Sequence, residues 1–212
     1  MRTSRHLEQV LAHAENRLAA TGSRRPTEVL PPYKKFLKVE EHRLRLKHQA
    51  GGGGREICAR RAELIDILLQ YVFGAAAAAA RENGGAEVPL ALVALGGYGR
   101  GELNPFSDID VMLLHRQRDE ISPHLEEMVN QVLYLLWDSG FKVGHSTRSI
   151  KEAIAQANSD MRTKTAMLEA RFLAGDTELA RQFREQFRSK CVVGHERDYV
   201  EMRMEDQVAR HK

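Results

Sequence analysis

The most restrictive feature of the sequence is a glycine-rich segment between two short apolar runs. The run Leu90–Leu95 leads into Gly96 and Gly97, and the segment reads GGYGRGELNPFSDIDVMLL as far as Leu114. Short apolar runs bounded by turn residues are typical of buried strands, and glycine permits the positive φ angles of tight turns. The segment therefore predicts two buried strands, Leu90–Leu95 and Ile109–Leu114, joined by a glycine-rich loop.

The composition of this loop is typical of an anion-binding turn. Its glycines allow the backbone to approach a ligand closely, and successive N–H groups form a concavity that suits phosphate. Arg100 adds a guanidinium whose fork matches phosphate oxygens. A P-loop would need Gly-Lys-Ser/Thr, which the sequence lacks, and a dinucleotide fingerprint would lead into a helix instead of a strand. We therefore expect a phosphate site of another kind at Gly96 and Gly97.

Two aspartates lie at the start of the second predicted strand. Asp108 and Asp110 are two residues apart, so alternation along a strand puts both carboxylates on one face. Neighbouring carboxylates repel unless a cation lies between them, and Mg²⁺ is held by one or two carboxylates together with substrate phosphates. A phosphate loop followed by such a pair predicts metal-assisted nucleotidyl transfer, with Asp108 and Asp110 as catalytic metal ligands.

The rest of the chain is largely helical in pattern. Apolar residues at helical spacing predict helices before and after the glycine-rich segment, and Phe141–Ser146 predicts a third strand. The expected helices are Arg5–Leu18, Tyr33–Gln49, Arg55–Asn83, Glu120–Ser139, Ser149–Asn158, Thr163–Leu173 and Thr177–Lys190. We expect an α/β (α+β) fold with a small mixed sheet: a helical segment 1–84, a catalytic core 85–150 and a second helical segment 151–212.

Composition excludes several classes of protein. The formal net charge is +3, and the charges interleave along helices, so no concentrated basic face for nucleic acid is expected. No uninterrupted apolar run approaches the ~20 residues of a membrane span, and the charged N-terminus has no secretory pattern. Cys58 and Cys191 are too few for a disulfide framework or a zinc site. A cytoplasmic protein that binds neither nucleic acid nor membranes is expected.

The glycine-rich segment closely resembles the nucleotidyltransferase signature of bacterial PII uridylyltransferases, within the DNA polymerase beta-like superfamily. Two later blocks, GHSTRSIKEAIAQANSD (Gly144–Asp160) and LEARFLAGD (Leu168–Asp176), are similar to the same family. The resemblance implies a small mixed sheet of the polymerase beta-like fold. It also implies transfer of UMP from UTP to a tyrosine of the PII nitrogen-regulatory protein, with Mg²⁺ and release of pyrophosphate.

Residue roles carry over from this resemblance position by position. Gly96 and Gly97 would hold the nucleotide phosphates, Asp108 and Asp110 would bind the metals, and Arg100 and Ser107 would support the nucleotide. The family removes UMP with an HD phosphohydrolase domain, but no His-Asp dipeptide occurs here. We therefore expect a transferase fragment or stand-alone domain, without removal activity and without glutamine-sensing domains.

Some assignments stay open. A third carboxylate of the superfamily site has no clear counterpart; the candidates are Asp138, Glu152 and Asp160, and a two-carboxylate site is the simpler interpretation. Secondary candidates are weighed against structural roles: His145 and Arg148 as phosphate contacts, Glu169 and Arg171 as packing or site residues, and Trp137 as a core residue. The alternatives to UMP transfer onto PII are transfer from ATP, a different protein acceptor, or a catalytically silent regulatory domain.

Overall fold

A four-stranded sheet lies at the centre of the protein. The computed structural model describes residues 5–19, 24–82, 89–116 and 123–210. The strands are β1 (Leu90–Ala94), β2 (Ile109–His115), β3 (Val143–Ser149) and β4 (Arg171–Gly175), in the order β3-β2-β1-β4. β1 is antiparallel to β2 and β4, whereas β2 and β3 are parallel. The expected α+β fold with a small mixed sheet is confirmed.

The fourth strand is a correction to the sequence prediction. A helix was expected over 163–173, but helix α7 (Met161–Leu168) ends earlier and Arg171–Gly175 pairs with β1. Helix propensity is a weak preference that tertiary contacts override. Here β4 pairs with the edge of β1 that β2 leaves free, and this pairing satisfies backbone groups on that edge.

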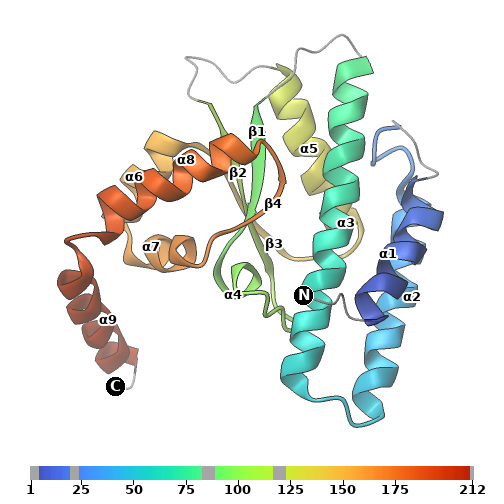
Figure 1. Ribbon diagram of the computed structural model, residues 1–212, viewed down its shortest axis with the longest axis horizontal. Helices are drawn as coiled ribbons and strands as arrows, with labels where there is room; N and C mark the ends of the chain where they lie inside the picture. Colours follow the sequence, from blue (N-terminus) through green and yellow to red (C-terminus); the bar gives the residue numbers. More distant parts are fainter. Residues whose placement is uncertain (1–4, 20–23, 83–88, 117–122, 211–212) are drawn as a thin grey trace.

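One face of the sheet is covered by the N-terminal helices and α5. Side chains at alternate positions of the central strands, including Leu92 and Val111, pack with α3 and α5 in one hydrophobic core. These helices are α1 (Arg5–Leu18), α2 (Leu30–Gln49), α3 (Gly54–Glu82) and α5 (Pro123–Asp138). Figure 1 shows α1 and α2 as an outer layer beyond α3. The expected helical positions 83 and 120–122 lie outside the described residues.

Helix α3 is the central element of this layer. Among the described residues it alone is long and apolar enough to cross a membrane, but 61% of its most apolar window is buried inside the protein. Its buried residues include Leu64, Leu68 and Val72. We therefore interpret α3 as a core helix.

The opposite face of the sheet carries the C-terminal helices. The intervening strand positions, including Val93 and Met112, pack with α6 (Ile150–Ser159) and α8 (Thr177–Phe187) in a second core. A π-helical turn, Arg188–Val192, follows α8, and α9 (Glu196–Arg210) then extends away from the sheet at the C-terminal end (Figure 1). The sheet is thus enclosed on both faces, and its loop ends remain available for a site.

Candidate active site

The two aspartates lie together at the start of β2. Asp110 is the second residue of the strand and Asp108 directly precedes it, and both are exposed. Partial desolvation, and secondly the negative charge of Asp108, raise the pKa of the Asp110 carboxyl above its ordinary value. The structure therefore brings the two carboxylates close enough to repel each other.

The Asp110 carboxylate lies between two glycines on neighbouring elements. A Cβ atom at Gly144, the register partner of Asp110 on β3, would overlap the Oδ1 atom of Asp110. A Cβ atom at Gly96 would lie 3.8 Å from the other carboxylate oxygen, Oδ2. Glycine inside a strand often marks such a close approach. Gly144 is therefore a site residue that sequence reasoning did not single out, although a glycine within a predicted strand was the available signal.

The glycine-rich loop begins as a single helical turn. Residues Gly96–Gly99 form the short helix α4, and Gly96 adopts a φ of +55°, in the left-handed region that favours glycine. The first N–H groups of a helix have no acceptor within the helix, so those of Gly96 and Gly97 are free of helical bonds. These are the two residues predicted to hold phosphate, and the first of them lies beside Asp110.

Arg100 and Ser107, which were predicted to support the nucleotide, form hydrogen bonds to other residues of the protein. Arg100 donates a hydrogen bond to Glu169 and also pairs with Glu102 (Nε–Oε2, 3.4 Å). The Glu169 hydrogen bond raises the pKa of the Arg100 guanidinium. Ser107 Oγ donates to the Asn104 carbonyl oxygen (2.9 Å) and so closes the turn before Asp108. Arg100 and Ser107 thus shape the loop, and the bond from Arg100 to Glu169 links it to the segment just before β4.

The segment that presents Asp108 is anchored to α3. The Leu103 N–H donates to the Cys58 carbonyl oxygen (3.2 Å), and Arg61 Nη1 donates to the Asn104 carbonyl oxygen (2.8 Å). Arg61 is buried, and its burial lowers the pKa of its guanidinium. Phe106 remains 96% exposed at the tip of this segment. The anchor keeps the turn in place ahead of the carboxylates.

Arg171, at the start of β4, holds the other end of α4. Its guanidinium binds both carboxylate oxygens of Asp66 on α3 (2.7 and 3.0 Å). The same group donates to the carbonyl oxygens of Gly99 and Tyr98 (both 3.1 Å). Burial acts to lower the pKa of Arg171, but the bonds to Asp66 raise it overall. Arg171, which sequence reasoning left between packing and site roles, therefore ties the glycine turn to α3.

Gly99 completes this attachment. A Cβ atom at Gly99 would overlap the carbonyl oxygen of Glu169, so only glycine allows α4 to lie this close to the start of β4. The end of the glycine-rich turn is consequently held by Arg171 of β4 and packed against Glu169, while its start at Gly96 lies beside Asp110 of β2.

The three candidates for a third carboxylate of the site are helix-capping or exposed residues. Glu152 closes a capping box on α6, with the Ser149 N–H donating to it at 2.7 Å, and Asp160 caps α7. These hydrogen bonds lower the pKa of both carboxyls. Asp138 is an exposed side chain at the last residue of α5. In the described ranges, no group of three or more His, Cys, Asp or Glu side chains could hold a metal.

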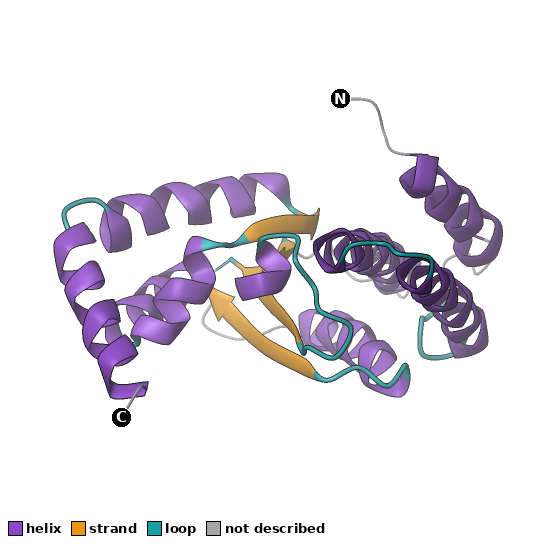
Figure 2. Cartoon of the chain, turned by 90° about the horizontal axis from the view of Figure 1, so that it is seen from below, coloured by secondary structure: helices purple, strands orange, loops and turns teal. Residues whose placement is uncertain are grey.

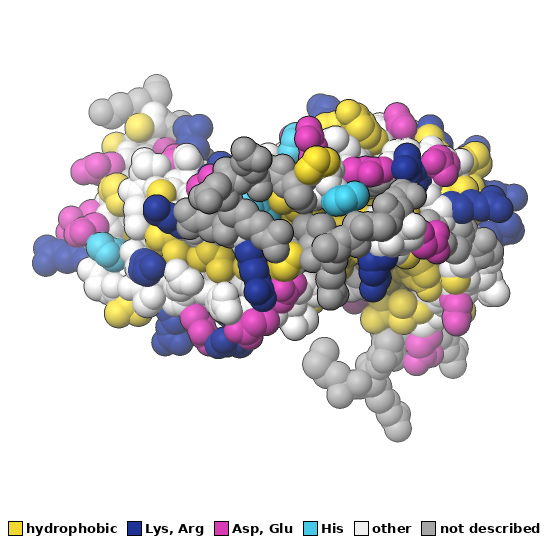
Figure 3. Space-filling view, turned by 90° about the horizontal axis from the view of Figure 1, so that it is seen from above, with side chains coloured by type: hydrophobic (Ala, Val, Ile, Leu, Met, Phe, Trp, Pro, Cys, Tyr) yellow, Lys and Arg dark blue, Asp and Glu magenta, His cyan; other side chains and the backbone are white. Residues whose placement is uncertain are grey.

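Among the remaining sequence candidates, Trp137 and His145 are exposed, Arg148 and Cys58 are half-buried, and Cys191 is buried. Trp137, expected in the core, is 41% exposed and its ring lies 5.5 Å from that of His145. The prediction of a core tryptophan is wrong because Trp137 faces outward at the end of α5. Cys58 and Cys191 are both free thiols. Acidic and basic side chains are interspersed on the face shown in Figure 3.

A glycine turn beside paired carboxylates on a small mixed sheet is the framework of a nucleotidyltransferase domain. The chain belongs to the family described as "Putative nucleotidyltransferase DUF294", which matches residues 46–170. The resemblance inferred from the sequence is thereby confirmed, and the match includes α4, Asp108, Asp110 and Gly144.

Curated relatives narrow the comparison further. The chain is 38% identical over 161 residues to the bifunctional uridylyltransferase/uridylyl-removing enzyme of Erythrobacter litoralis, covering 75% of the chain and 17% of that enzyme. It is 38% identical over 162 residues to the enzyme of the same name from Rhodospirillum rubrum, covering 76% and 17%. Identity to the Ruegeria pomeroyi enzyme is 41% over 123 residues, covering 58% and 13%. The chain thus matches less than a fifth of the length of these relatives.

Proposed function

We propose that this chain is a magnesium-dependent uridylyltransferase that transfers UMP from UTP to a tyrosine of the PII nitrogen-regulatory protein. The observation that carries the proposal is the Asp110 carboxylate between Gly96 and Gly144, with Asp108 beside it. The relatives named as uridylyltransferases support UMP as the transferred group. The free cysteines and the buried α3 are compatible with a cytoplasmic location, which we propose as well.

The residues of the site fit a magnesium ion. Asp108 and Asp110 supply carboxylate oxygens, the donors that Mg²⁺ prefers, and nucleotide phosphates supply further ligands in such sites. Desolvation, and secondly the charge of Asp108, raise the pKa of Asp110, and a bound cation would offset both effects. When bound, the ion would polarise the phosphoryl oxygens and offset the charge that develops during transfer.

The other groups orient the reactants. The N–H groups of Gly96 and Gly97 would bind phosphate oxygens of UTP, and α3, through Arg171, holds that turn in place. The tyrosine oxygen forms a bond to the α-phosphorus while the bond from that phosphorus to the β-phosphate oxygen breaks. Pyrophosphate leaves, and the phenolic proton passes to solvent. Asp110 must stay ionised to act as a ligand in this reaction.

The test is transfer of labelled UMP, and separately AMP, onto purified PII protein with Mg²⁺. We expect UMP labelling by the wild-type chain and its loss in the Asp108→Asn/Asp110→Asn variant. Glu185→Gln, an exposed change on α8, is the matched control and should label as wild type does. AMP labelling alone would overturn the nucleotide assignment, and equal labelling by the double aspartate variant would overturn the site.

A further inference from the structure

Strand β3 forms one open edge of the sheet. It pairs only with β2 among the described strands, and the Ile109 N–H donates to the Lys142 carbonyl oxygen at 2.9 Å. Backbone groups of successive strand residues point to alternate sides. The groups of Lys142 and Gly144 therefore point toward β2, and those of Val143, His145 and Thr147 point outward. Figure 2 shows β3 as the lowest strand of the sheet, with its outer side facing away from the other strands.

The outward backbone groups have no hydrogen-bond partner within the described part of the chain. None of the backbone bonds outside the helices and the sheet involves Val143, His145 or Thr147. At the opposite edge the situation differs, because Gln70 of α3 donates to the Leu173 carbonyl oxygen of β4 (3.2 Å). An open edge of this kind is a template for a further strand.

Aromatic side chains follow the open edge. Tyr134 and Trp137 on α5 are 50% and 41% exposed, and their rings meet at 5.6 Å. Trp137 in turn meets His145 on β3 at 5.5 Å between ring centres. We call Tyr134, Trp137 and His145 the aromatic stripe. Exposed Tyr and Trp side chains are enriched where proteins bind other proteins.

The edge is also cationic. Lys142 precedes β3 and Lys151 follows it, and neither is in an ion pair with another described residue, whereas the charge of Arg148 acts on Glu152. Unpaired cations favour a partner with acidic side chains, because complementary charge directs association and sets the register.

The open edge lies next to the proposed catalytic carboxylate. The carboxylate of Asp110 extends over Gly144, since its Oδ1 atom occupies the space of a Cβ there. A strand added to β3 would lie about 4.8 Å from the backbone of Gly144. A long side chain on that strand could therefore meet the Asp110 carboxylate without crossing any side chain of β3.

We propose that the open edge of β3 is the docking surface for the protein acceptor, which binds as an extended, acidic segment in the manner of an added strand. Backbone bonds to Val143, His145 and Thr147 provide the pairing, and the aromatic stripe holds apolar side chains of the acceptor. The acceptor side chain then projects over Gly144 to the site. This inference rests on the proposed transfer of UMP to a protein.

The decisive variant is Thr147→Pro, which removes one outward N–H donor and is tolerated on an edge strand. Thr147→Val is the matched control, because it keeps the N–H group and suits a strand. Because one pairing hydrogen bond is lost, we expect Thr147→Pro to raise the KM for purified PII protein by up to ~10-fold, with the KM for UTP unchanged. Thr147→Val should match the wild type in both. Equal acceptor KM values for the two variants would overturn the proposal.

A second measurement needs no variant. Hydrogen exchange of the wild-type chain, with and without PII protein, should show protection of the amides of Val143, His145 and Thr147 in the complex. A complex without this protection, or no complex at all, overturns the docking surface. Protection without UMP transfer would retain the surface and overturn the proposed function instead. A dimer of the chain that Thr147→Pro dissociates would assign the edge to self-association and overturn the proposal.

Discussion

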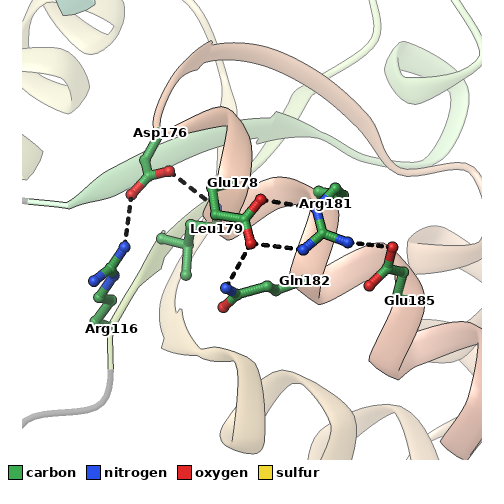
Figure 4. Close-up of polar contacts among 7 residues, drawn as sticks. All are labelled: Arg116, Asp176, Glu178, Leu179, Arg181, Gln182 and Glu185. Atoms are coloured by element: carbon green, nitrogen blue, oxygen red, sulfur yellow. Dashed lines mark hydrogen bonds and ion pairs between the residues drawn. The ribbon is translucent and has the colours of Figure 1, made fainter.

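Two arginine networks in this protein look alike and differ in what they hold. Arg171 is half-buried and joins Asp66, which lies 105 positions away, to the carbonyl oxygens at the end of α4. Arg181 is exposed on α8 and binds Glu178 and Glu185, three and four positions away (Figure 4). The Arg171 network joins separate elements around the glycine turn. The Arg181 network connects residues of a single helix.

A large pKa shift marks the exposed network. The Arg181 hydrogen bond lowers the pKa of Glu178 to about 2. Yet exposed ion pairs contribute little to stability because water and salt screen them. The structural importance of a charge pair therefore depends on which elements it connects more than on the size of the pKa shift.

Gly144→Ala is expected to have a large effect on UMP transfer through a steric change alone. The added methyl group would displace the Asp110 carboxylate, and misplacing a reacting group by about 1 Å can cost ~100-fold in rate. We expect UMP transfer to fall by about that factor. The measurement is kcat for transfer, together with circular dichroism to verify folding. Gly74→Ala, where a Cβ meets nothing within 4 Å, is the control, and an equal loss there would refute the steric explanation.

Arg171→Lys comes next. Lysine cannot bind both oxygens of Asp66 and two carbonyl oxygens at once, so we expect a loss of about 2 kcal/mol in the free energy of unfolding. Because α4 also loosens, UTP binding should weaken in the same variant. Urea unfolding and UTP titration measure the two effects. If the network acts as one unit, Asp66→Asn in the Arg171→Lys background adds almost nothing; full additivity would argue against such a unit.

Asp110→Asn should separate stability from activity. The pKa of the Asp110 carboxyl is raised, so its ionised form disfavours the fold; the contribution of this group to stability is fully present at low pH and is lost as pH rises through the raised pKa. At pH 7 we expect the amide to be slightly more stable than the wild type, while transfer is lost. Thermal unfolding from pH 3 to pH 8 tests this, because the gain should vanish at the acid end. A variant less stable than wild type at pH 7 would contradict it.

The smallest effect belongs to the exposed network. Glu178→Gln removes the charge that Arg181 binds, and we expect no measurable change in UMP transfer or in Tm at pH 7. A depressed carboxyl pKa contributes stability only above its ordinary value, so any small loss should fade as pH falls toward 2. A marked fall in transfer would contradict the interpretation that only the Arg171 network supports the site.

The sequence was most informative where residues are close along the chain. The strand–turn–strand order and the start of a helix near Ser149 follow from local spacing and backbone geometry. The family followed from one contiguous segment. Local rules failed at β4, where LEARFL suits a helix by propensity and only pairing with β1 makes it a strand.

The sequence by itself determined the kind of site that we propose: a glycine turn followed by two neighbouring carboxylates at the start of a strand. Only the tertiary structure decided which distant residues complete it. Gly144 makes room for Asp110 because β2 and β3 lie in register, and Arg171 holds the turn because β4 joins the sheet beside α3. The physical reason is that short-range order follows from the backbone and from side-chain alternation. Contacts over long separations depend instead on how whole elements pack.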